Sequence, residues 1–363
     1  MTAEQGNRSF PLAPPIEPML AKLADALPPE EGVSLFEPKW DGFRAIVFRG
    51  EADVFIQSRD LKPLDRYFPE LHDALLEALP HACVLDGEIV ITTPDGLAFE
   101  ALQMRLHPAA SRVAKLAKEI PSSFVAFDVL AADGQNLMSV PQGERRVVLE
   151  RLLADVRPPV YLTPCTRDRV TAERWLKEFE GAGLDGVIVK PLHARYEPGK
   201  RSMIKVKHAR SADCVVAGFR WYKVDRSAIG SLLLGLYDDR GQLQHVGVTS
   251  SFSMAERKQL AAELAPLREN ALDGHPWAEW AIAQGEGRMP GGQSRWSAGK
   301  DLSWEPLRIE RVCEVKYDHM QGDRFRHAAT FLRWRPDKQP NECTYEQLEV
   351  TPPYELQRIF ATR

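Results

Sequence analysis

Lys39 stands in a short motif whose residue types suit nucleophilic chemistry. Lys39, Asp41, Gly42 and Arg44 follow the order K-x-D-G-x-R, and an Asp-Gly pair is typical of a tight turn between two strands. The lysine is therefore expected at the end of a strand, where its amine is presented rather than buried. These four positions match by accident in roughly one chain of this length in 200. Alone, the motif also fits a plain hairpin turn with solvated charges.

A nucleophilic lysine needs other positive charges close to it. The usual pKa near 10.4 leaves only about one lysine amine in 2,500 neutral at pH 7, and neighbouring cations lower that pKa. The basic residues available for this purpose are Arg44, Arg59, Lys190, Lys205 and Lys207. A lone K-x-K pair, such as the last two residues, is also common on a solvated strand face.

Two acidic residues are candidates for holding a divalent metal. Attack on a nucleotide phosphate builds negative charge on the phosphate oxygens, which basic side chains and a carboxylate-bound cation stabilise. Glu88 and Asp185 belong to Asp-Gly elements that interrupt otherwise apolar strands. Each of these acids also fits an exposed turn or bulge. The joint occurrence of both acids with the lysines favours the metal interpretation.

The elements that must position these residues predict an α+β fold with antiparallel sheets and flanking helices. Alternating apolar residues predict strands, with a hairpin turn at 41–42, over 33–40, 43–50, 53–60, 83–91, 124–130 and 184–190. Helical spacing of apolar residues predicts helices over 64–79, 111–118, 144–153 and 172–179.

A change of pattern near 209–213 marks a domain boundary. The later segments predict short strands over 212–221, 231–239 and 243–250 and a helix near 254–268, as in a small barrel of the OB type. We therefore predict domains at 1–209 and 210–363. A Gly- and Ser-rich stretch over 285–299 predicts a loop.

Composition places the chain among ordinary globular proteins. It has 363 residues, 44% hydrophobic and 27% charged, which is enough for two domains. No apolar run approaches the roughly 18 residues of a membrane span, and the N-terminus shows no secretory signal. We expect a cytoplasmic protein with no membrane partner. The five cysteines lie far apart, which argues against a zinc site, and a net charge of −4 leaves nucleic-acid binding to local basic patches.

Taken in order, the motifs resemble those of the covalent nucleotidyltransferase superfamily, and within it the small bacterial ATP-dependent DNA ligases of LigC type. The motifs are E-P-K-W-D-G-F-R over 37–44, Ser58-Arg59, Asp86-Gly87-Glu88, Phe127-Asp128, D-G-V-I-V-K over 185–190, Lys205-Val206-Lys207 and R-P-D-K over 335–338. The resemblance extends from Met19 to about Lys338. It implies an ATP-grasp-like nucleotidyltransferase (adenylation) domain followed by an OB-fold β-barrel domain.

The resemblance also implies a role for each motif residue. Lys39 forms a covalent lysyl-AMP, Phe127 stacks on adenine, and Glu37 lies at the edge of the base. The residues implied to hold the nucleotide are Glu37, Lys39, Arg44, Arg59, Glu88, Phe127, Lys190, Lys205, Lys207, Arg335 and Lys338. Of these, Arg335 and Lys338 orient the leaving pyrophosphate when the second domain closes. Glu88 and Asp185 are implied to hold Mg²⁺ or Mn²⁺, although the family usually has glutamate where this chain has Asp185.

The implied function is the sealing of 3′-hydroxyl/5′-phosphate nicks in duplex DNA, through lysyl-AMP and DNA-adenylate intermediates, in DNA repair. ATP is expected rather than NAD because only 38 residues precede Lys39 and the chain has no four-cysteine zinc module. We expect a monomer, and the sequence identifies no repair or end-joining partner. The basic residues available for DNA contact are Arg308, Arg311, Lys316, Arg324, Arg326, Arg333, Arg335 and Lys338.

Other interpretations of the same motifs stay open. An mRNA-capping guanylyltransferase shares the lysine motif, the carboxylates, the K-x-K pair and the two-domain plan, and an RNA ligase shares the chemistry. The lead-in Pro18-Met19-Leu20-Ala21 and Trp40 favour a DNA ligase. From another class, a non-catalytic protein would bind strands with the OB-like domain alone. The presence of the nucleophile, Glu88 and the K-x-K lysines argues against this last interpretation.

Overall fold

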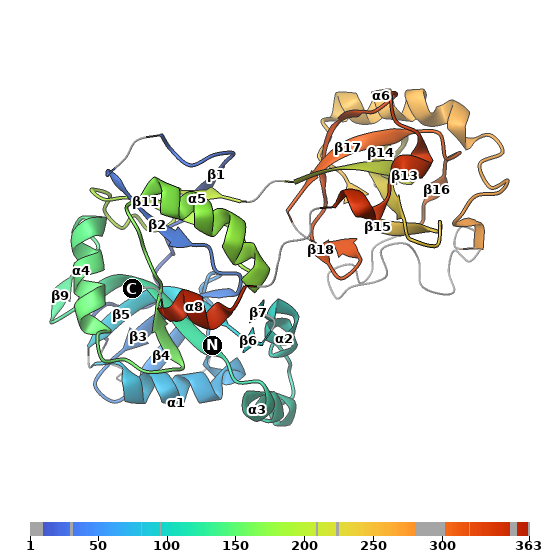
Figure 1. Ribbon diagram of the computed structural model, residues 1–363. Helices are drawn as coiled ribbons and strands as arrows, with labels where there is room; N and C mark the ends of the chain where they lie inside the picture. Colours follow the sequence, from blue (N-terminus) through green and yellow to red (C-terminus); the bar gives the residue numbers. More distant parts are fainter. Residues whose placement is uncertain are drawn as a thin grey trace. The chain divides into compact units, whose positions relative to one another are not determined.

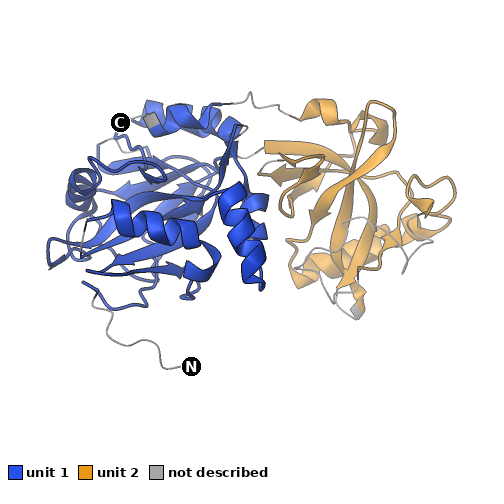
Figure 2. Ribbon diagram, turned by 90° about the horizontal axis from the view of Figure 1, so that it is seen from below, with its two compact units in different colours: residues 1–208, 351–363 blue, residues 209–350 orange. Residues whose placement is uncertain are grey.

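The protein was analysed as a computed structural model, which describes residues 10–29, 32–80, 82–94, 96–207, 210–222, 225–279, 302–318, 320–348 and 354–361. The chain divides into two compact units (Figure 1, Figure 2). Unit 1 comprises Met1–His208 together with Thr351–Arg363, and unit 2 comprises Ala209–Val350. The predicted loop over 285–299 lies outside the described residues.

The first sheet of unit 1 brings several predicted site residues onto neighbouring strands. Its strand order is β1 (Ala21–Ala24), β12 (Met203–Val206), β11 (Val187–Pro191) and β2 (Ser34–Pro38). The pair β1 and β12 is parallel, and the other pairs are antiparallel. Ile188 on β11 lies opposite Glu37 on one side and Lys205 on the other. Residues far apart in the sequence are thus neighbours in space.

The second sheet of unit 1 carries Arg44 and Glu88, which lie opposite each other on adjacent strands. Its order is β10 (Val160–Leu162), β8 (Ser123–Ala132), β5 (Cys83–Val90), β3 (Phe43–Arg49) and β4 (Val54–Ser58), with β9 (Gln135–Asn136) pairing with β8. The strands β3 and β5 are almost entirely buried. A strand covered on both faces reads as a nearly continuous apolar run, as these two do.

Helices pack on the sheets of unit 1 (Figure 1). They are α1 (Pro69–Ala78), α2 (Phe99–Met104), α3 (Ala110–Glu119), α4 (Gln142–Leu152), α5 (Arg169–Glu178) and α8 (Leu356–Ala361). α1 begins at Pro69, whose fixed φ suits the first helical position, and buries Leu71 and Leu75 in the core beside the second sheet. No helix among the described residues is long and apolar enough to cross a membrane.

Unit 2 has its own core and is built mainly on one antiparallel sheet, beside which β18 (Met320–Gln321) and β19 (Arg324–Phe325) form a two-stranded sheet. The order is β15 (Leu243–Thr249), β14 (Asp225–Tyr237), β13 (Arg210–Tyr222), β17 (Val312–Tyr317) and β20 (Thr330–Trp334), and β16 (Glu305–Pro306) pairs with β13. Register shifts between β13 and β14 mark bulges, which bend strands as a barrel requires. The helix α6 (Met254–Leu264) begins in a capping box of Ser253 and Glu256.

Two predictions about the fold need correction. The hairpin turn expected at 41–42 does not form, because β2 and β3 belong to different sheets and the chain crosses between them at Asp41-Gly42. Gly42 permits the crossing, since a Cβ there would lie 2.1 Å from the backbone oxygen of Ile89. The second domain was predicted to end at 363, whereas Thr351–Arg363 belongs with unit 1. The physical reason is that apolar side chains of α8 join the core of unit 1.

Candidate active site

Lys39 lies where the chain leaves the first sheet for the second. Its backbone N–H donates to the Gly186 carbonyl (2.8 Å), and its own carbonyl accepts from the Asp185 N–H (2.9 Å). Gly186 has a φ of +134°, and a Cβ there would lie 2.1 Å from the Val206 carbonyl oxygen. Glycine alone permits so close an approach. The turn before β11 therefore holds the backbone of Lys39.

Asp185 holds the side chain of Lys39 as well. The Lys39 Nζ lies 2.5 Å from Asp185 Oδ2, and the Lys207 Nζ lies 3.0 Å from the same oxygen. Burial acts to raise the pKa of Asp185, but the ion pairs with the two lysines outweigh burial and hold that pKa below its ordinary value. Asp185 is thus ionised at neutral pH and bridges Lys39 to the K-x-K pair.

Lys205 adds a third ammonium group to this cluster. Burial and the nearby positive charges of Lys39 and Lys207 lower the pKa of Lys205, against the opposing effect of Asp185. Lysines close enough to shift the pKa of a neighbour create a local positive potential. Such a potential favours an anion such as a nucleotide phosphate.

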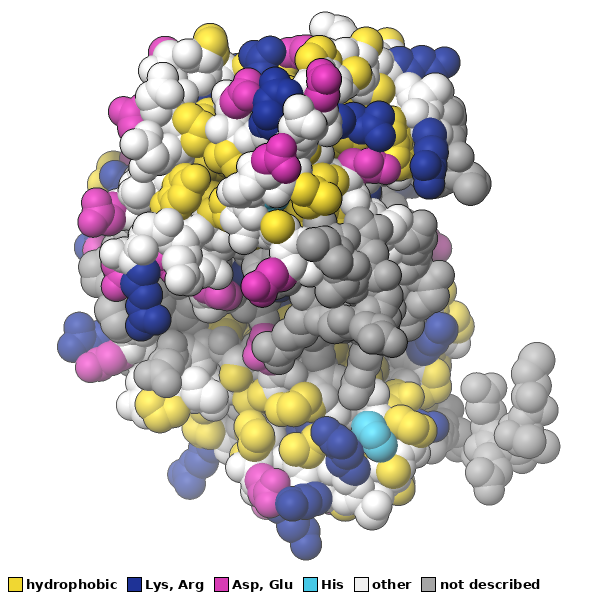
Figure 3. Space-filling model, turned by 90° about the vertical axis from the view of Figure 1, so that its right-hand side faces the viewer, with side chains coloured by type: hydrophobic (Ala, Val, Ile, Leu, Met, Phe, Trp, Pro, Cys, Tyr) yellow, Lys and Arg dark blue, Asp and Glu magenta, His cyan; other side chains and the backbone are white. Residues whose placement is uncertain are grey.

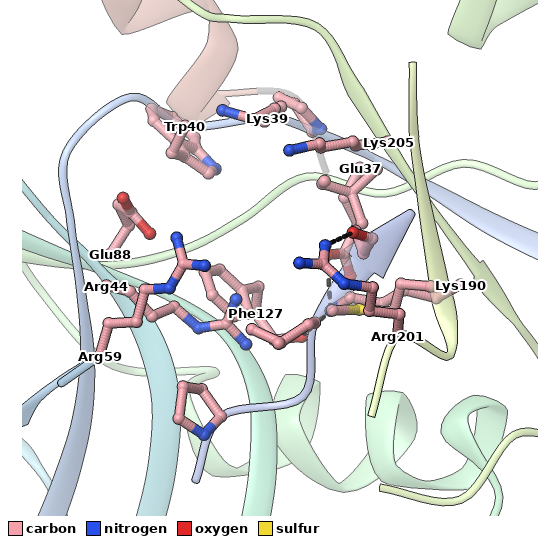
Figure 4. Close-up of a pocket in the computed structure, with 16 residues that line it drawn as sticks. Glu37, Lys39, Trp40, Arg44, Arg59, Glu88, Phe127, Lys190, Arg201 and Lys205 are labelled. Atoms are coloured by element: carbon pink, nitrogen blue, oxygen red, sulfur yellow. Dashed lines mark hydrogen bonds and ion pairs between the residues drawn. The ribbon is translucent and has the colours of Figure 1, made fainter. Parts of the chain in front are cut away.

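A cavity of about 180 Å³ opens beside the lysines and is lined from both sheets. Its lining residues are Pro18, Leu20, Ala21, Glu37, Pro38, Lys39, Trp40, Arg44, Arg59, Glu88, Phe127, Ile188, Lys190, Arg201, Met203 and Lys205. Figure 4 shows Arg44, Arg59, Glu88, Phe127 and Lys205 around the opening. The structure thus brings together every predicted nucleotide-binding residue of unit 1, with Lys207 joined to the group through its ion pair.

Glu37 and Lys190 form a buried ion pair in the cavity wall. The Lys190 Nζ lies 2.8 Å from Glu37 Oε2, and Arg146 Nη1 lies 3.5 Å from Oε1. Lys190 also donates to the Phe127 carbonyl (2.7 Å), and its ammonium lies 4.8 Å from the centre of the Phe127 ring. These contacts occupy the Lys190 ammonium, so this side chain fixes Glu37 and Phe127 in place.

Arg44 is oriented by a network of buried polar groups. Its guanidinium makes two hydrogen bonds of 2.6 Å to the Asp86 carboxylate and lies 4.6 Å from the centre of the Phe127 ring. The Tyr196 hydroxyl donates to the same carboxylate (2.6 Å) and accepts from the Met19 N–H (3.1 Å). A bidentate pair of this kind fixes the plane of the guanidinium as well as its position.

Glu88 presents a carboxyl group with an altered pKa. Its Oε1 accepts from the Gly42 N–H (3.1 Å). Burial raises the pKa of Glu88 to about 7, although the positive charges of Arg44 and Lys39 act to lower it. Carboxylate oxygens such as those of Glu88 and Asp185 suit Mg²⁺, which proteins usually hold with one or two carboxylates together with substrate phosphates. Both acids lie near Lys39, Asp185 through its ion pair and Glu88 close enough for the Lys39 charge to act on its pKa, so two carboxylates beside a phosphate fit this arrangement. No group of three or more His, Cys, Asp or Glu that could hold a metal ion occurs among the described residues.

The other two predicted residues, Arg335 and Lys338, belong to unit 2. The Arg335 Nη1 lies 2.8 Å from both carboxylate oxygens of Asp213, and its Nη2 lies 2.8 Å from Asp337 Oδ2. Lys338 lies in the turn that follows, where its N–H donates to the Arg335 carbonyl (3.2 Å). Two carboxylates of unit 2 therefore hold Arg335.

Sequence reasoning missed Arg201 and Tyr196. Arg201 lines the cavity and donates to the Ala21 carbonyl (3.0 Å). The sequence held a signal for Arg201. In an extended chain every second side chain points to the same face, and Arg201, Met203 and Lys205 all line the cavity. Tyr196 had no local signal, since its partners Asp86 and Met19 lie 110 and 177 residues away in the sequence.

Comparison with known proteins identifies the family of this chain. Residues 18–207 match the model of the ATP dependent DNA ligase domain, and residues 225–338 match that of the ATP dependent DNA ligase C terminal region. Over 346 residues the chain is 56% identical to DNA ligase C2 of Mycolicibacterium smegmatis, covering 94% of this chain and 97% of that protein. It is 54% identical to DNA ligase C of Mycobacterium tuberculosis, covering 94% and 95%. A solved Lig E DNA ligase has a similar fold, with a TM-score of 0.54 and 19% identity over 88% of this chain and 99% of that one.

The chain therefore belongs to the ATP-dependent DNA ligases. Within them it is a ligase of the small bacterial LigC type, as its motifs predicted. The predicted fold class is confirmed, a nucleotidyltransferase domain with an OB-fold domain. The comparisons do not favour a guanylyltransferase, an RNA ligase or a non-catalytic binding protein.

Proposed function

We propose that Lys39 is the nucleophile that takes AMP from ATP. In this step the Lys39 Nζ gives up a proton and bonds to the α-phosphorus, while the bond from that phosphorus to the pyrophosphate oxygen breaks. The observation that carries the proposal is that Lys39 and Lys205 line one cavity, with Lys207 joined to Lys39 through Asp185. Clustered cations stabilise the negative charge that develops on phosphate oxygens during the transfer.

The cavity residues divide into two groups by the part of the nucleotide that they hold. Phe127 stacks on the adenine and Glu37 lies at the edge of the base, a geometry supported by the contacts of Lys190 with both residues. Arg44 and Arg59 bind the ribose and the phosphates. Lys205 and Lys207 hold the α-phosphate next to Lys39. Fixed donors such as the Asp86-bound Arg44 need little reorganisation when the nucleotide arrives.

Glu88 and Asp185 are the residues that would hold Mg²⁺ or Mn²⁺. The cation, when bound, supplies positive charge that neutralises the phosphate oxygens. Asp185 is one methylene shorter than the glutamate usual in the family, yet its carboxylate already stands beside the Lys39 amine. The shorter acid therefore still reaches the reacting end of the lysine.

The AMP is then used to seal nicks in duplex DNA. It moves from Lys39 to a 5′-phosphate, and the 3′-hydroxyl across the nick displaces it as the new phosphodiester bond forms. Arg335 and Lys338 act in the first step, on the leaving pyrophosphate. We further infer that the enzyme works as a monomer in the bacterial cytoplasm and serves DNA repair.

Basic residues of unit 2 are proposed to contact the DNA backbone. Several of those predicted already pair with acids of the same unit, as Arg308 does with Glu310 and Arg333 with Glu314. Figure 3 likewise shows basic and acidic side chains interspersed on the face it presents. DNA must then compete with internal ion pairs, so affinity for a nick is expected to be modest and to fall steeply as salt rises.

The test of the nucleophile is covalent labelling. The purified protein is incubated with Mg²⁺ and α-labelled ATP or GTP and then denatured. We expect acid-labile label from ATP on the wild-type protein and none on Lys39→Ala. Lys115→Ala is the matched control, because Lys115 is an exposed lysine on α3 that pairs only with Glu119 in the same helix among the described ion pairs.

The same preparation then separates the alternative substrates. Sealing of nicked duplex DNA, and weaker or absent sealing of nicked RNA, is the expected result. Label from GTP alone would favour a guanylyltransferase, and preference for RNA ends would favour an RNA ligase. Absence of label from either nucleotide would contradict the assignment of Lys39.

A further inference from the structure

The segment that follows unit 2 in the sequence packs into the core of unit 1. On α8, Leu356 and Ile359 are buried in a hydrophobic cluster that also contains Trp40 and Trp175. Tyr354, just before the helix, contacts the ring of Phe179 at a centroid distance of 5.2 Å. A six-residue helix has little stability by itself, so these tertiary contacts hold it.

The aromatic side chain of Phe360 on this helix contacts Trp40, the residue next to Lys39. The Phe360 and Trp40 rings are stacked, with centroids 5.2 Å apart and planes inclined by 11°. Phe360 also stacks on Tyr161, at 3.9 Å and 20°. Near-parallel aromatic contacts of this kind restrict how a ring can tilt or slide.

Trp40 links this contact to the reacting lysine. Its indole Nε1 donates to Thr163 Oγ1 (2.8 Å), so a hydrogen bond fixes the edge of the ring while Phe360 packs on its face. Trp40 is 5% exposed and also lines the cavity. The preceding residue, Lys39, has its backbone bound to Asp185 and Gly186. The Lys39 backbone is thus anchored on one side by β11's turn and on the other by the Trp40 ring.

We propose that Phe360 is a positioning residue for lysine adenylation, acting through Trp40. This inference rests on the proposed role of Lys39. Loss of the Phe360 ring leaves Trp40 free to tilt into the vacated space, and the attached Lys39 backbone moves with it. A displacement of about 1 Å between a nucleophile and its target can cost about 100-fold in rate. Displacement of AMP at a nick does not use the Lys39 amine as a nucleophile and is unaffected.

Phe360→Ala in the full chain tests this directly. The rate of lysyl-AMP formation is measured by rapid quench at saturating ATP, and sealing of a pre-adenylated nick is measured on the same preparation. We expect the first rate to fall by about 10- to 100-fold with little change in the ATP concentration for half-maximal rate. Sealing of the pre-adenylated nick should stay within about twofold of wild type, because that step needs no attack by Lys39.

Two further variants separate positioning from general folding. Phe360→Tyr keeps the ring and should recover most of the lysyl-AMP rate. Gln357→Ala changes an exposed position of the same helix and should match wild type in both reactions. Wild-type rates of lysyl-AMP formation in Phe360→Ala would overturn the inference, and so would equal loss of both reactions without recovery in Phe360→Tyr. If the wild-type protein forms no lysyl-AMP, the proposed role of Lys39 fails first.

Discussion

The buried hydroxyl of Tyr196 offers a sharp test of the network around Arg44. Tyr196 is 4% exposed, and its hydroxyl lies between the Asp86 carboxylate and the Met19 N–H. Burial and the neighbouring Asp86 charge raise the pKa of Tyr196 well above its ordinary value, so the hydroxyl keeps its proton and donates it to the carboxylate. Tyr196→Phe removes this one oxygen and leaves the ring in place.

The cost of the substitution follows from the two lost hydrogen bonds. A hydrogen bond to a charged group contributes about 2 kcal/mol, which is lost from Asp86. The Met19 N–H, in a residue that is 1% exposed, is left without its acceptor, and a buried unpaired donor adds about 1 kcal/mol. The sum is about 3 kcal/mol, and for a unit of this size each kcal/mol lowers the melting temperature by about 2–4 °C. Unit 1 should therefore melt about 6–12 °C below wild type.

Activity should change much less than stability. Arg44 keeps both of its hydrogen bonds to Asp86 in the variant, so its guanidinium stays close to its native orientation. We expect ATP binding to weaken by about threefold, equivalent to about 0.7 kcal/mol. Calorimetric melting and ATP titration of lysyl-AMP formation measure the two effects on the same sample.

Tyr161→Phe is the matched control, because it removes a hydroxyl from a less buried tyrosine and keeps the ring that stacks on Phe360. This control should melt within about 2 °C of wild type, as for a substitution near the surface. If Tyr196→Phe melts no lower than Tyr161→Phe, the hydrogen bonds to Asp86 and Met19 do not carry the stability assigned to them. If affinity for ATP falls by more than about 100-fold, the two hydrogen bonds that Arg44 keeps with Asp86 are not sufficient to orient it, and the expected threefold effect is wrong.

Three further predictions concern substitutions of single residues. Because the pKa of Glu88 is raised from 4.5 to about 7, folding stability should fall as pH rises through that interval. Relative to Glu88→Gln, the metal-free protein should lose about 3 kcal/mol of unfolding free energy between pH 5 and 8, as measured by urea unfolding. If stability changes with pH equally in the two proteins, the raised pKa is contradicted. Gly186→Ala would place a Cβ 2.1 Å from a backbone oxygen of β12, so it should abolish lysyl-AMP formation and destabilise by more than about 3 kcal/mol. The control is Gly134→Ala, because Gly134 also has a positive φ (+72°) but no atom lies within 4 Å of an added Cβ. This control should lower the free energy of unfolding by only about 1 kcal/mol. Equal losses of stability in the two variants would rule out the steric argument. Asp213→Asn weakens the ion pair with Arg335, whose Nη1 lies 2.8 Å from both carboxylate oxygens of Asp213, and should lower the melting temperature of unit 2 in differential scanning calorimetry. An unchanged melting curve would contradict a stabilising role for this pair.

The sequence by itself was sufficient for the family, the order of the motifs and most of the strands and helices. These features depend on local periodicity and on residue types at short spacing. Sequence periodicity placed β3 and β4, and the apolar spacing that predicted a helix over 64–79 located α1, which begins at Pro69 and ends at Ala78 in the structure. The predicted cavity residues of unit 1 also came from motifs that are each only a few residues long.

Tertiary structure alone decided which of these residues touch one another. The sequence did not indicate that Asp185 would bridge Lys39 and Lys207, or that Lys190 would be held by Glu37. It suggested a hairpin at 41–42 because Asp-Gly favours a turn, whereas the chain there crosses between sheets. It also assigned the C-terminal segment with α8 to the second domain, whereas this segment belongs to unit 1. The sequence does not determine which of the two hydrophobic cores buries the apolar side chains of so short a helix. Contacts between residues more than 100 positions apart are set by packing and strand order, which leave no periodic trace in the chain.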